Sequence, residues 1–277
     1  MKRQRISTER VSAILKNEWG QLLGNKVVIF TTLGPPLLLV TIALSALIMS
    51  SWVGGFDITK LNLKTLSPEQ QKAVVDSLKE TTTLQRDLKF ALLSSFLVLF
   101  QMIPMVVPLS IASHSIVGEK QNRSLEPLLA TPIRTEELLF AKAIAAAVPG
   151  VIATWIGFVL FAIGARFAVT EDVYNKLILG PAWLVSIIVL TPLFTLLTVG
   201  LSIIISSRVK DPNTAQQVGS LIILPLIGLL VGQMLGVVNG SLRVIIATAV
   251  IMVLLDLSVL STAVRMFKRE EILTNWR

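Results

Sequence analysis

The sequence has no cysteine and only one histidine among its 277 residues. Without cysteine the chain can form neither a disulfide bond nor a thiolate metal site. The lone histidine, His114, cannot build a histidine cluster, and without a partner it is more often incidental than functional. The phosphate loop G-x-x-x-x-G-K-[ST] and the motifs H-E-x-x-H and G-x-S-x-G are also absent. We therefore expect no catalytic residue, no metal site and no ATP bound through that loop.

Charged residues are scarce as well, at 15% of the chain, whereas 53% of the residues are hydrophobic. The mean hydropathy is +0.75, and the apolar residues fall in long blocks. This composition is typical of a membrane protein. The net charge of +8 then reflects topology signals and contact with anionic lipid headgroups, and we expect no nucleic-acid partner.

Six apolar stretches are long enough to cross a bilayer core of about 30 Å as helices. They predict a single transmembrane domain over residues 1–277, an all-α membrane protein with six transmembrane helices. The predicted spans are Val27 to Met49, Phe90 to Val117, Leu139 to Ala165, Ala182 to Ser206, Val218 to Val238 and Leu242 to Val264.

The positions of lysine and arginine predict the orientation of these spans. With the N-terminus inside, 16 of the 25 basic residues lie in inner segments and 9 in outer ones. Six of the outer nine lie in the long loop 51–89, together with five acidic residues. The positive-inside rule therefore places both termini in the cytoplasm. We expect the chain in the plasma or inner membrane of a prokaryote.

Residues 9–23 have the period of an amphipathic helix that lies in the membrane interface. Glu18 falls within its apolar stripe, beside Trp19, where an ionised carboxylate is costly unless it is paired. Two alternatives are open for Glu18: its side chain reaches water, or it pairs with a basic residue of the inner loops.

The external loop 51–89 is too long for a simple turn. The sequence here predicts the start of a helix, with Ser67 as the N-cap, Pro68 at the first helical position and Gln70 as the capping-box glutamine. We expect a short external helix from here to about Leu84.

Two prolines and a glutamine lie within the second predicted span. Pro104 and Pro108 each remove a backbone donor, so a kink is expected there. Gln101, one turn away, is a candidate pathway residue, and an interhelical hydrogen bond is the alternative.

The last two spans carry further features. Gly228, Gly232 and Gly236 form two overlapping G-x-x-x-G steps, which permit close helix approach within the bundle or at a subunit interface. Asp256 lies well inside the sixth span, where an ionised carboxylate costs about 2.5 to 3.5 kcal/mol. It is a candidate pathway residue for a cation or substrate, and a protonated or hydrogen-bonded structural acid is the alternative.

The inner loop 118–142 encodes two short helices with a break between them. Ser124 can cap the first helix, which Pro132 ends. Thr135 can cap a second helix that runs into the third span. A small amphipathic helix tied to two spans can transmit a push from a soluble partner, or it can simply touch lipid headgroups.

The same loop resembles that of the ABC-2 type family of ABC transporter permeases. The family pattern is Glu-Lys/Arg-Glu-x-Gly/Arg-Ser/Thr-Leu-Glu-x-Leu-Leu-x-Thr/Ser-Pro, followed by Glu-Leu-Leu and a lysine. Gln121 and Ala141 depart from it, and a second resemblance covers 206–217. The matching residues are Glu119, Lys120, Arg123, Ser124, Leu125, Glu126, Leu128, Leu129, Thr131, Pro132, Glu137, Leu138, Leu139 and Lys142.

This resemblance implies a non-catalytic permease subunit of an ATP-driven exporter. It implies a cytoplasmic coupling helix that docks on a separate ATPase, two ATPase subunits that hold ATP and Mg²⁺, and a second permease subunit in a homodimer or heterodimer. Lipid, drug, peptide antibiotic and sodium remain open as substrates. The residues expected to couple to the ATPase are Glu119, Arg123, Leu125, Glu126, Leu128 and Leu129.

Two other functions are compatible with the composition. An ion-coupled secondary transporter or channel would work without ATP, and Asp256 and the two prolines of the second span suit it. A membrane anchor that assembles another enzyme would transport nothing. The pattern in the inner loop is not expected from the ion-coupled transporter or channel.

Overall fold

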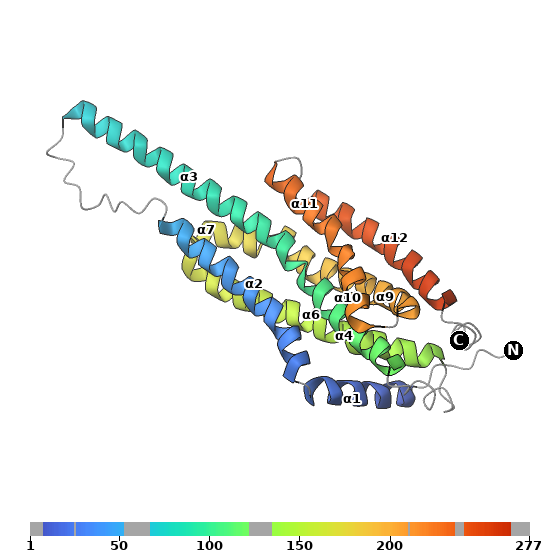
Figure 1. Ribbon diagram of the computed structural model, residues 1–277. Helices are drawn as coiled ribbons and strands as arrows, with labels where there is room; N and C mark the ends of the chain where they lie inside the picture. Colours follow the sequence, from blue (N-terminus) through green and yellow to red (C-terminus); the bar gives the residue numbers. More distant parts are fainter. Residues whose placement is uncertain are drawn as a thin grey trace.

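The computed structural model describes residues 8–24, 26–52, 67–121, 135–209, 211–235 and 241–266. Within these ranges every regular element is a helix (Figure 1). Six stretches are long and apolar enough to cross a membrane, which confirms the predicted all-α fold with six spans. These stretches are Thr32–Ser50, Arg86–Ser115, Phe140–Ala168, Glu171–Arg208, Pro212–Gly232 and Leu242–Ala263.

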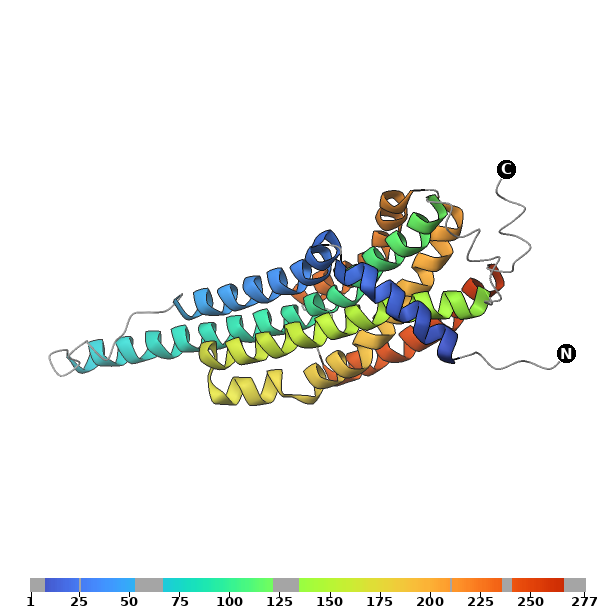
Figure 2. The same ribbon diagram turned by 90° about the horizontal axis from the view of Figure 1, so that it is seen from below.

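The first two helices are set at a steep angle to one another. Helix α1 (Thr8–Gly24) crosses one end of the bundle, and α2 (Lys26–Trp52) runs along the bundle as the first span (Figures 1 and 2). The helix predicted over residues 9–23 is therefore present. Its place at the membrane surface stays a prediction.

The expected external helix is longer than predicted and is continuous with the second span. Helix α3 (Pro68–Phe100) does not end near Leu84 but continues into the span as one helix of 33 residues. The capping box at its start is as predicted, with the Gln70 N–H donating to Ser67 Oγ and the Ser67 N–H to Gln70 Oε1. No proline or glycine interrupts the sequence after Leu84, so nothing stops the helix there.

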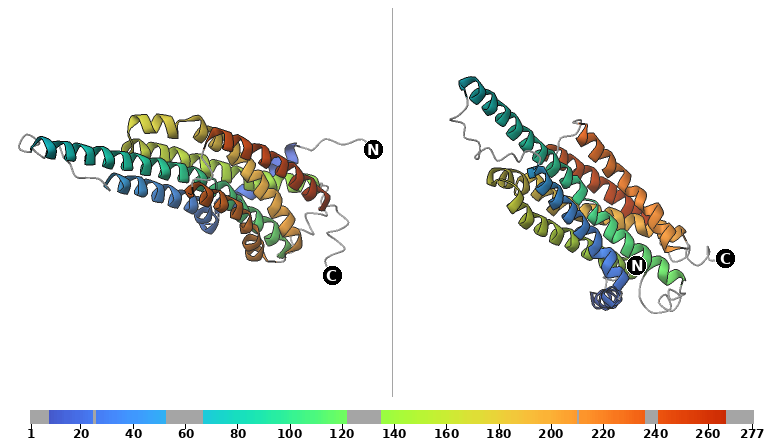
Figure 3. Two further views of the ribbon diagram at one scale, coloured as in Figure 1. Left: turned by 90° about the horizontal axis from the view of Figure 1, so that it is seen from above. Right: turned by 60° about the vertical axis from the view of Figure 1, so that its left-hand side comes forward.

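The predicted kink in the second span is a break in the helix. Helix α3 ends at Phe100, and α4 (Ile103–Gln121) begins three residues later. Pro104 lacks the N–H that would bond Phe100 C=O, so the α-helix cannot run through this point unchanged. Helix α3 projects beyond the other helices at the end remote from α1 (Figure 3).

Helix α6 (Thr135–Ala168) forms the third span, and the fourth span is broken into several pieces. The fourth span begins at Glu171, eleven residues before the predicted Ala182. A methyl group at Gly180 would lie 2.2 Å from the Lys176 carbonyl oxygen, so only glycine fits this turn. The pieces are α7 (Glu171–Val173), the π-helix η3 (Tyr174–Ile178), α8 (Pro181–Val185), the π-helix η4 (Ser186–Leu190) and α9 (Thr191–Arg208).

The fifth span begins at Pro212, earlier than the predicted Val218. It is made of α10 (Pro212–Ser220), the 3₁₀-helix η5 (Leu221–Ile223) and α11 (Leu224–Met234). Asp211 caps α10 by accepting from the Thr214 N–H at 2.9 Å. Helix α12 (Leu242–Met266) forms the sixth span and packs along α9.

The core of the bundle lies between α4, α6 and the fourth span. Trp183 of α8 stacks on Phe161 and Phe158 of α6, with ring centroids 5.4 and 5.7 Å apart. Phe100, at the end of α3, lies 5.2 Å from Phe161 and 5.8 Å from Trp183. These rings fix the broken fourth span against α6.

Candidate functional site

Helix α4 ends before and helix α6 begins after the coupling segment, residues 122–134, which contains most of the residues expected to couple to the ATPase. Helix α4 ends at Gln121 with Glu119 in its last turn, and α6 begins at Thr135 and runs directly into the third span, as expected. The other predicted coupling residues, Arg123, Leu125, Glu126, Leu128 and Leu129, lie outside the described residues. The described part of the site is therefore the pair of helix ends that hold this segment.

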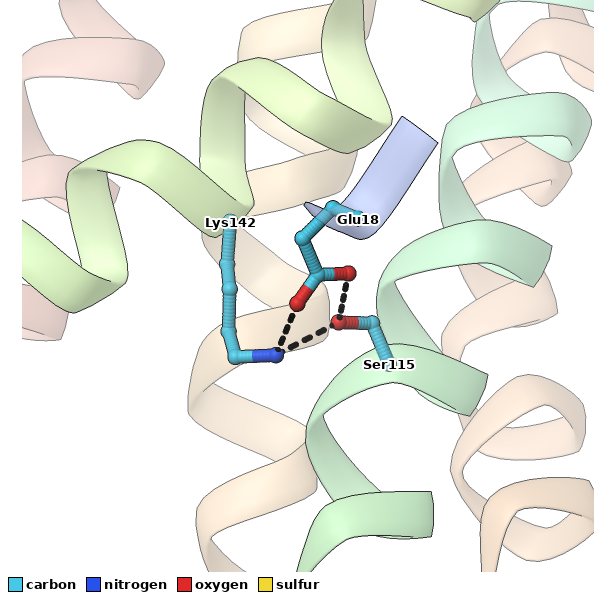
Figure 4. Close-up of polar contacts among 3 residues, drawn as sticks. All are labelled: Glu18, Ser115 and Lys142. Atoms are coloured by element: carbon cyan, nitrogen blue, oxygen red, sulfur yellow. Dashed lines mark hydrogen bonds and ion pairs between the residues drawn. The ribbon is translucent and has the colours of Figure 1, made fainter. Parts of the chain in front are cut away.

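A closed cluster of three polar side chains joins these helix ends to α1 (Figure 4). Lys142 Nζ of α6 lies 2.6 Å from Glu18 Oε1 of α1 and donates to Ser115 Oγ of α4 at 2.8 Å. The Ser115 hydroxyl in turn donates to Glu18 Oε2 at 3.0 Å. One side chain from each of the three helices thus contacts the other two.

The cluster is shielded from solvent. The Lys142 and Glu18 side chains are 3% and 8% exposed. An unpaired charge at such a place costs several kcal/mol, whereas a pair with further hydrogen bonds is tolerated. Of the two alternatives for Glu18, the structure shows the pairing with a basic residue.

Two further contacts fasten α1 to α6. Arg10 lies 3.7 Å from Glu137, whose side chain is 2% exposed and sits in the first turn of α6. A carboxylate there also interacts favourably with the positive end of the helix dipole. The Trp19 indole N–H donates to the Ala145 carbonyl at 3.3 Å. Helix α1 is thereby attached along more than two turns of α6.

The two candidate pathway residues lie in different parts of the bundle. Gln101, between α3 and α4, donates to the Ser186 carbonyl at 3.1 Å and to Ser186 Oγ at 2.7 Å. This is the interhelical bond that was the alternative to pathway lining. Asp256 lies on α12, with both carboxylate oxygens buried and without a hydrogen-bond partner among the described residues. No hydrogen bond in the described chain joins Gln101 to Asp256.

Gly228 and His114, which the sequence also singled out, take no part in the cluster, and Gly236 lies outside the described residues. A methyl group at Gly228 would meet nothing within 4 Å, so Gly228 makes no close helix contact within the described chain. His114 is exposed on α4. In the ranges that the structure describes, no group of three or more histidine, aspartate or glutamate residues could hold a metal ion.

Sequence reasoning named Glu18 as a site residue and gave Glu137 and Lys142 only as matches to the family pattern, and it assigned no role to Ser115 or Arg10. A signal existed for Lys142, because it is a lone cation at the start of an apolar span and so needs a carboxylate nearby. Nothing comparable marks Ser115. The hydroxyl becomes important only because α4 brings it between the two charges.

A family model described as ABC-2 family transporter protein matches residues 89–270. The match includes α4, α6 and the segment between them, and it begins after α1 and α2. A search of the curated proteins finds no match. Because the matched region covers well over half of the chain and all but the first of the six spans, the chain belongs to the ABC-2 family of ABC transporter permeases.

Proposed function

We propose that the chain is the transmembrane permease subunit of an ATP-driven exporter. Two separate ATPase subunits bind ATP and Mg²⁺, and two permease subunits form the pathway. Both termini lie in the cytoplasm of a prokaryotic cell. The chain itself carries out no catalysis.

The observation that carries this proposal is the Glu18, Ser115 and Lys142 cluster. It joins α1 to both helices that bound the coupling segment, 122–134. A subunit that docks on this segment would act on α4 and α6 together, because the cluster connects them. The same contacts pass the displacement to α1.

The mechanism follows from these connections. ATP binding draws the two ATPases together, and the coupling segment moves with them. Because α4 and α6 lead directly into the second and third spans, movement of their ends changes the packing of those spans. The rearrangement opens the pathway to the outside and expels the substrate.

An ion-coupled transporter is the second candidate, and one observation favours it. The Asp256 carboxylate is buried in the sixth span and has no hydrogen-bond partner in the described chain. Intramembrane carboxylates often belong to ion or proton pathways. Replacement by asparagine in Asp256→Asn tests this, because unchanged transport would exclude a role for Asp256 in the pathway.

The docking assignment is tested by co-purification with the ATPase. Charge reversal at Arg123 combined with Leu128→Asp, as R123E/L128D, should abolish co-purification. The matched control is Lys176→Glu, because Lys176 is 70% exposed and lies in η3, which directly follows α7 at the end of the bundle remote from α1 (Figure 1). Retention of the ATPase by R123E/L128D would show that the segment is not the docking site.

Reconstitution in liposomes separates the three functions. A permease gives flux that depends on ATP and on the ATPase subunit. A secondary transporter gives flux that depends on an ion gradient alone, and an anchor gives none.

A further inference from the structure

Three prolines within the spans each leave a carbonyl without its donor from the same helix, and in each case a side chain from another helix replaces that donor. The first is Pro149 in α6. A proline has no N–H, so the Ala145 carbonyl, four residues earlier, loses its usual partner. Trp19 of α1 donates its indole N–H to this oxygen at 3.3 Å.

The second case is in α4. Pro108 cannot donate to the carbonyl of Pro104, four residues before it. The Thr195 hydroxyl of α9, a side chain that is 1% exposed, donates to this oxygen at 3.3 Å. Helix α4 is also packed tightly at Pro108, since a methyl group at Gly150 of α6 would lie 2.4 Å from the Pro108 ring.

The third case is in the fourth span, where the helix is wider. In the π-helix Ser186–Leu190, each N–H bonds the carbonyl five residues earlier, as the Thr191 N–H does with Ser186. Pro192 therefore cannot serve the Ile187 carbonyl, five residues before it. Trp155 of α6 donates its indole N–H to that oxygen at 3.1 Å.

These three bonds form a connected series through the molecule. Trp19 joins α1 to α6 at Pro149, and Trp155 joins α6 to the π-helix of the fourth span. Thr195 then joins the fourth span to α4 at the Pro104 carbonyl. Proline bends are tolerated in a membrane where neighbouring helices satisfy the freed backbone groups. A donor on another helix can leave when that helix moves, whereas an N–H of the same helix cannot.

We propose that Trp19, Trp155 and Thr195 are positioning residues for transport: each sets the bend of another span by binding a proline-freed carbonyl. The proposal rests on the function proposed above, since it gives the route by which movement of α1 reaches the centre of the bundle. When movement of the coupling segment turns α1 against α6 about the Glu18, Ser115 and Lys142 cluster, the Trp19 bond is released and the angle of α6 at Pro149 changes. Trp155 and Thr195 carry that change to the fourth span and to α4.

The bend of α6 can be measured directly because the chain has no native cysteine. Spin labels on Phe140→Cys and Phe167→Cys lie on either side of Pro149 at positions that are 50% and 87% exposed. The labelled residues are about 40 Å apart along the helix axis, which suits pulsed electron paramagnetic resonance. The full-length chain is studied in lipid nanodiscs.

Trp19→Phe keeps an aromatic ring and removes the N–H donor. It should shift and broaden the distance distribution of α6 in the native background. Pro149→Ala restores the N–H to the Ala145 carbonyl, so Trp19→Phe should have no effect in that background. Equal shifts in both backgrounds, or no shift in either, would overturn the assignment.

The same labels test the link to transport when the chain is assembled with its ATPase. ATP should shift the α6 distance in the native chain, and Trp19→Phe should remove most of that shift. An active complex in which ATP leaves the distance unchanged would refute the proposal. Failure of the native chain to bind an ATPase counts against the proposed function instead, while the measurement on the chain alone still decides the role of Trp19.

Thr195 provides a second series that does not depend on Trp19. Thr195→Val should lower the midpoint of thermal unfolding, Thr195→Ser should not, and Pro108→Ala should remove the effect of Thr195→Val. The matched control is Thr198→Val, because Thr198 is equally buried but donates to Phe194 of its own helix. Equal losses for the two valine variants would show that Thr195 acts only through packing.

Discussion

At the scale of single residues, the cluster at α1, α4 and α6 contains one negative and one positive charge held by a hydroxyl. Each of the two charges depends on the other, because water reaches neither side chain freely. The stability of the cluster thus lies in the pairing and not in either charge alone.

Removal of one charge should be far more damaging than removal of both. Lys142→Met leaves the Glu18 carboxylate buried and unpaired, which should lower the free energy of unfolding by about 3 to 5 kcal/mol. The double variant Glu18→Gln with Lys142→Met should lose much less. Unfolding of the full-length chain by titration with a denaturing detergent measures both.

An exposed ion pair serves as the control for that experiment. Lys176 lies 3.1 Å from Asp172, and both side chains are at least 70% exposed. Lys176→Met should therefore change the free energy of unfolding by less than about 1 kcal/mol. Equal losses for Lys142→Met and Lys176→Met would mean that the Glu18 pair is not buried in the membrane-embedded protein.

At the scale of helices, prolines and glycines determine where the spans bend and how closely they approach. Gly150 of α6 lies directly against Pro108 of α4, and Gly219 of α10 lies against Leu109, where a methyl group would be 2.3 Å from Cδ1. These small residues let α6 and α10 pack on α4 at short range.

A methyl group at the first of these contacts should force the helices apart. Gly150→Ala should lower the free energy of unfolding by about 1 to 3 kcal/mol, because the Pro108 ring cannot rotate away. Detergent-induced unfolding of the purified chain would measure the loss.

Gly228→Ala is the matched control within the fifth span, where the added methyl group meets nothing within 4 Å. It should be neutral or should stabilise the helix by up to about 1 kcal/mol. A loss of dimer in this variant, with the monomer intact, would place the G-x-x-x-G steps at a subunit interface. A destabilised monomer would contradict the open environment of Gly228.

Sequence patterns predicted the spans well because hydropathy and length report directly on the membrane. They predicted the capping box at Ser67 for a similarly local reason. They did not predict where the fourth span begins, because Asn175, Lys176 and the turn at Gly180 interrupt the apolar run between Glu171 and Ala182. The continuous α3 was missed because its first part is polar and its last part is apolar. The change in composition indicated the end of a helix, although no proline or glycine ends the helix there.

At the scale of the whole molecule, the candidate site depends on contacts between distant segments. Glu18 and Lys142 are 124 residues apart in sequence. Sequence reasoning could place each of them near the same membrane surface, but only the packing of α1 against α6 brings them together. The coupling segment was recognised from its own residues, whereas the cluster that connects its ends could not be.

The orientation of the chain can be tested with single cysteines. Gln21→Cys lies on the exposed face of α1, and Glu69→Cys lies at the start of α3, at the opposite end of the bundle. If both termini are cytoplasmic, a membrane-impermeant maleimide should label only Glu69→Cys in intact cells. Both should be labelled after permeabilisation, and labelling of Gln21→Cys in intact cells would reverse the topology.

The unbroken α3 has a mechanical consequence. Its 33 residues span about 50 Å, and it is joined to α4 through the short break at Gln101, so it behaves as a rigid lever with its pivot inside the bundle. A tilt of about 10° at this pivot would carry the far tip near Pro68 sideways by about 9 Å, for a helix of that length. A small change in the packing of the second span would therefore cause a large displacement of the N-terminal end of α3, outside the membrane.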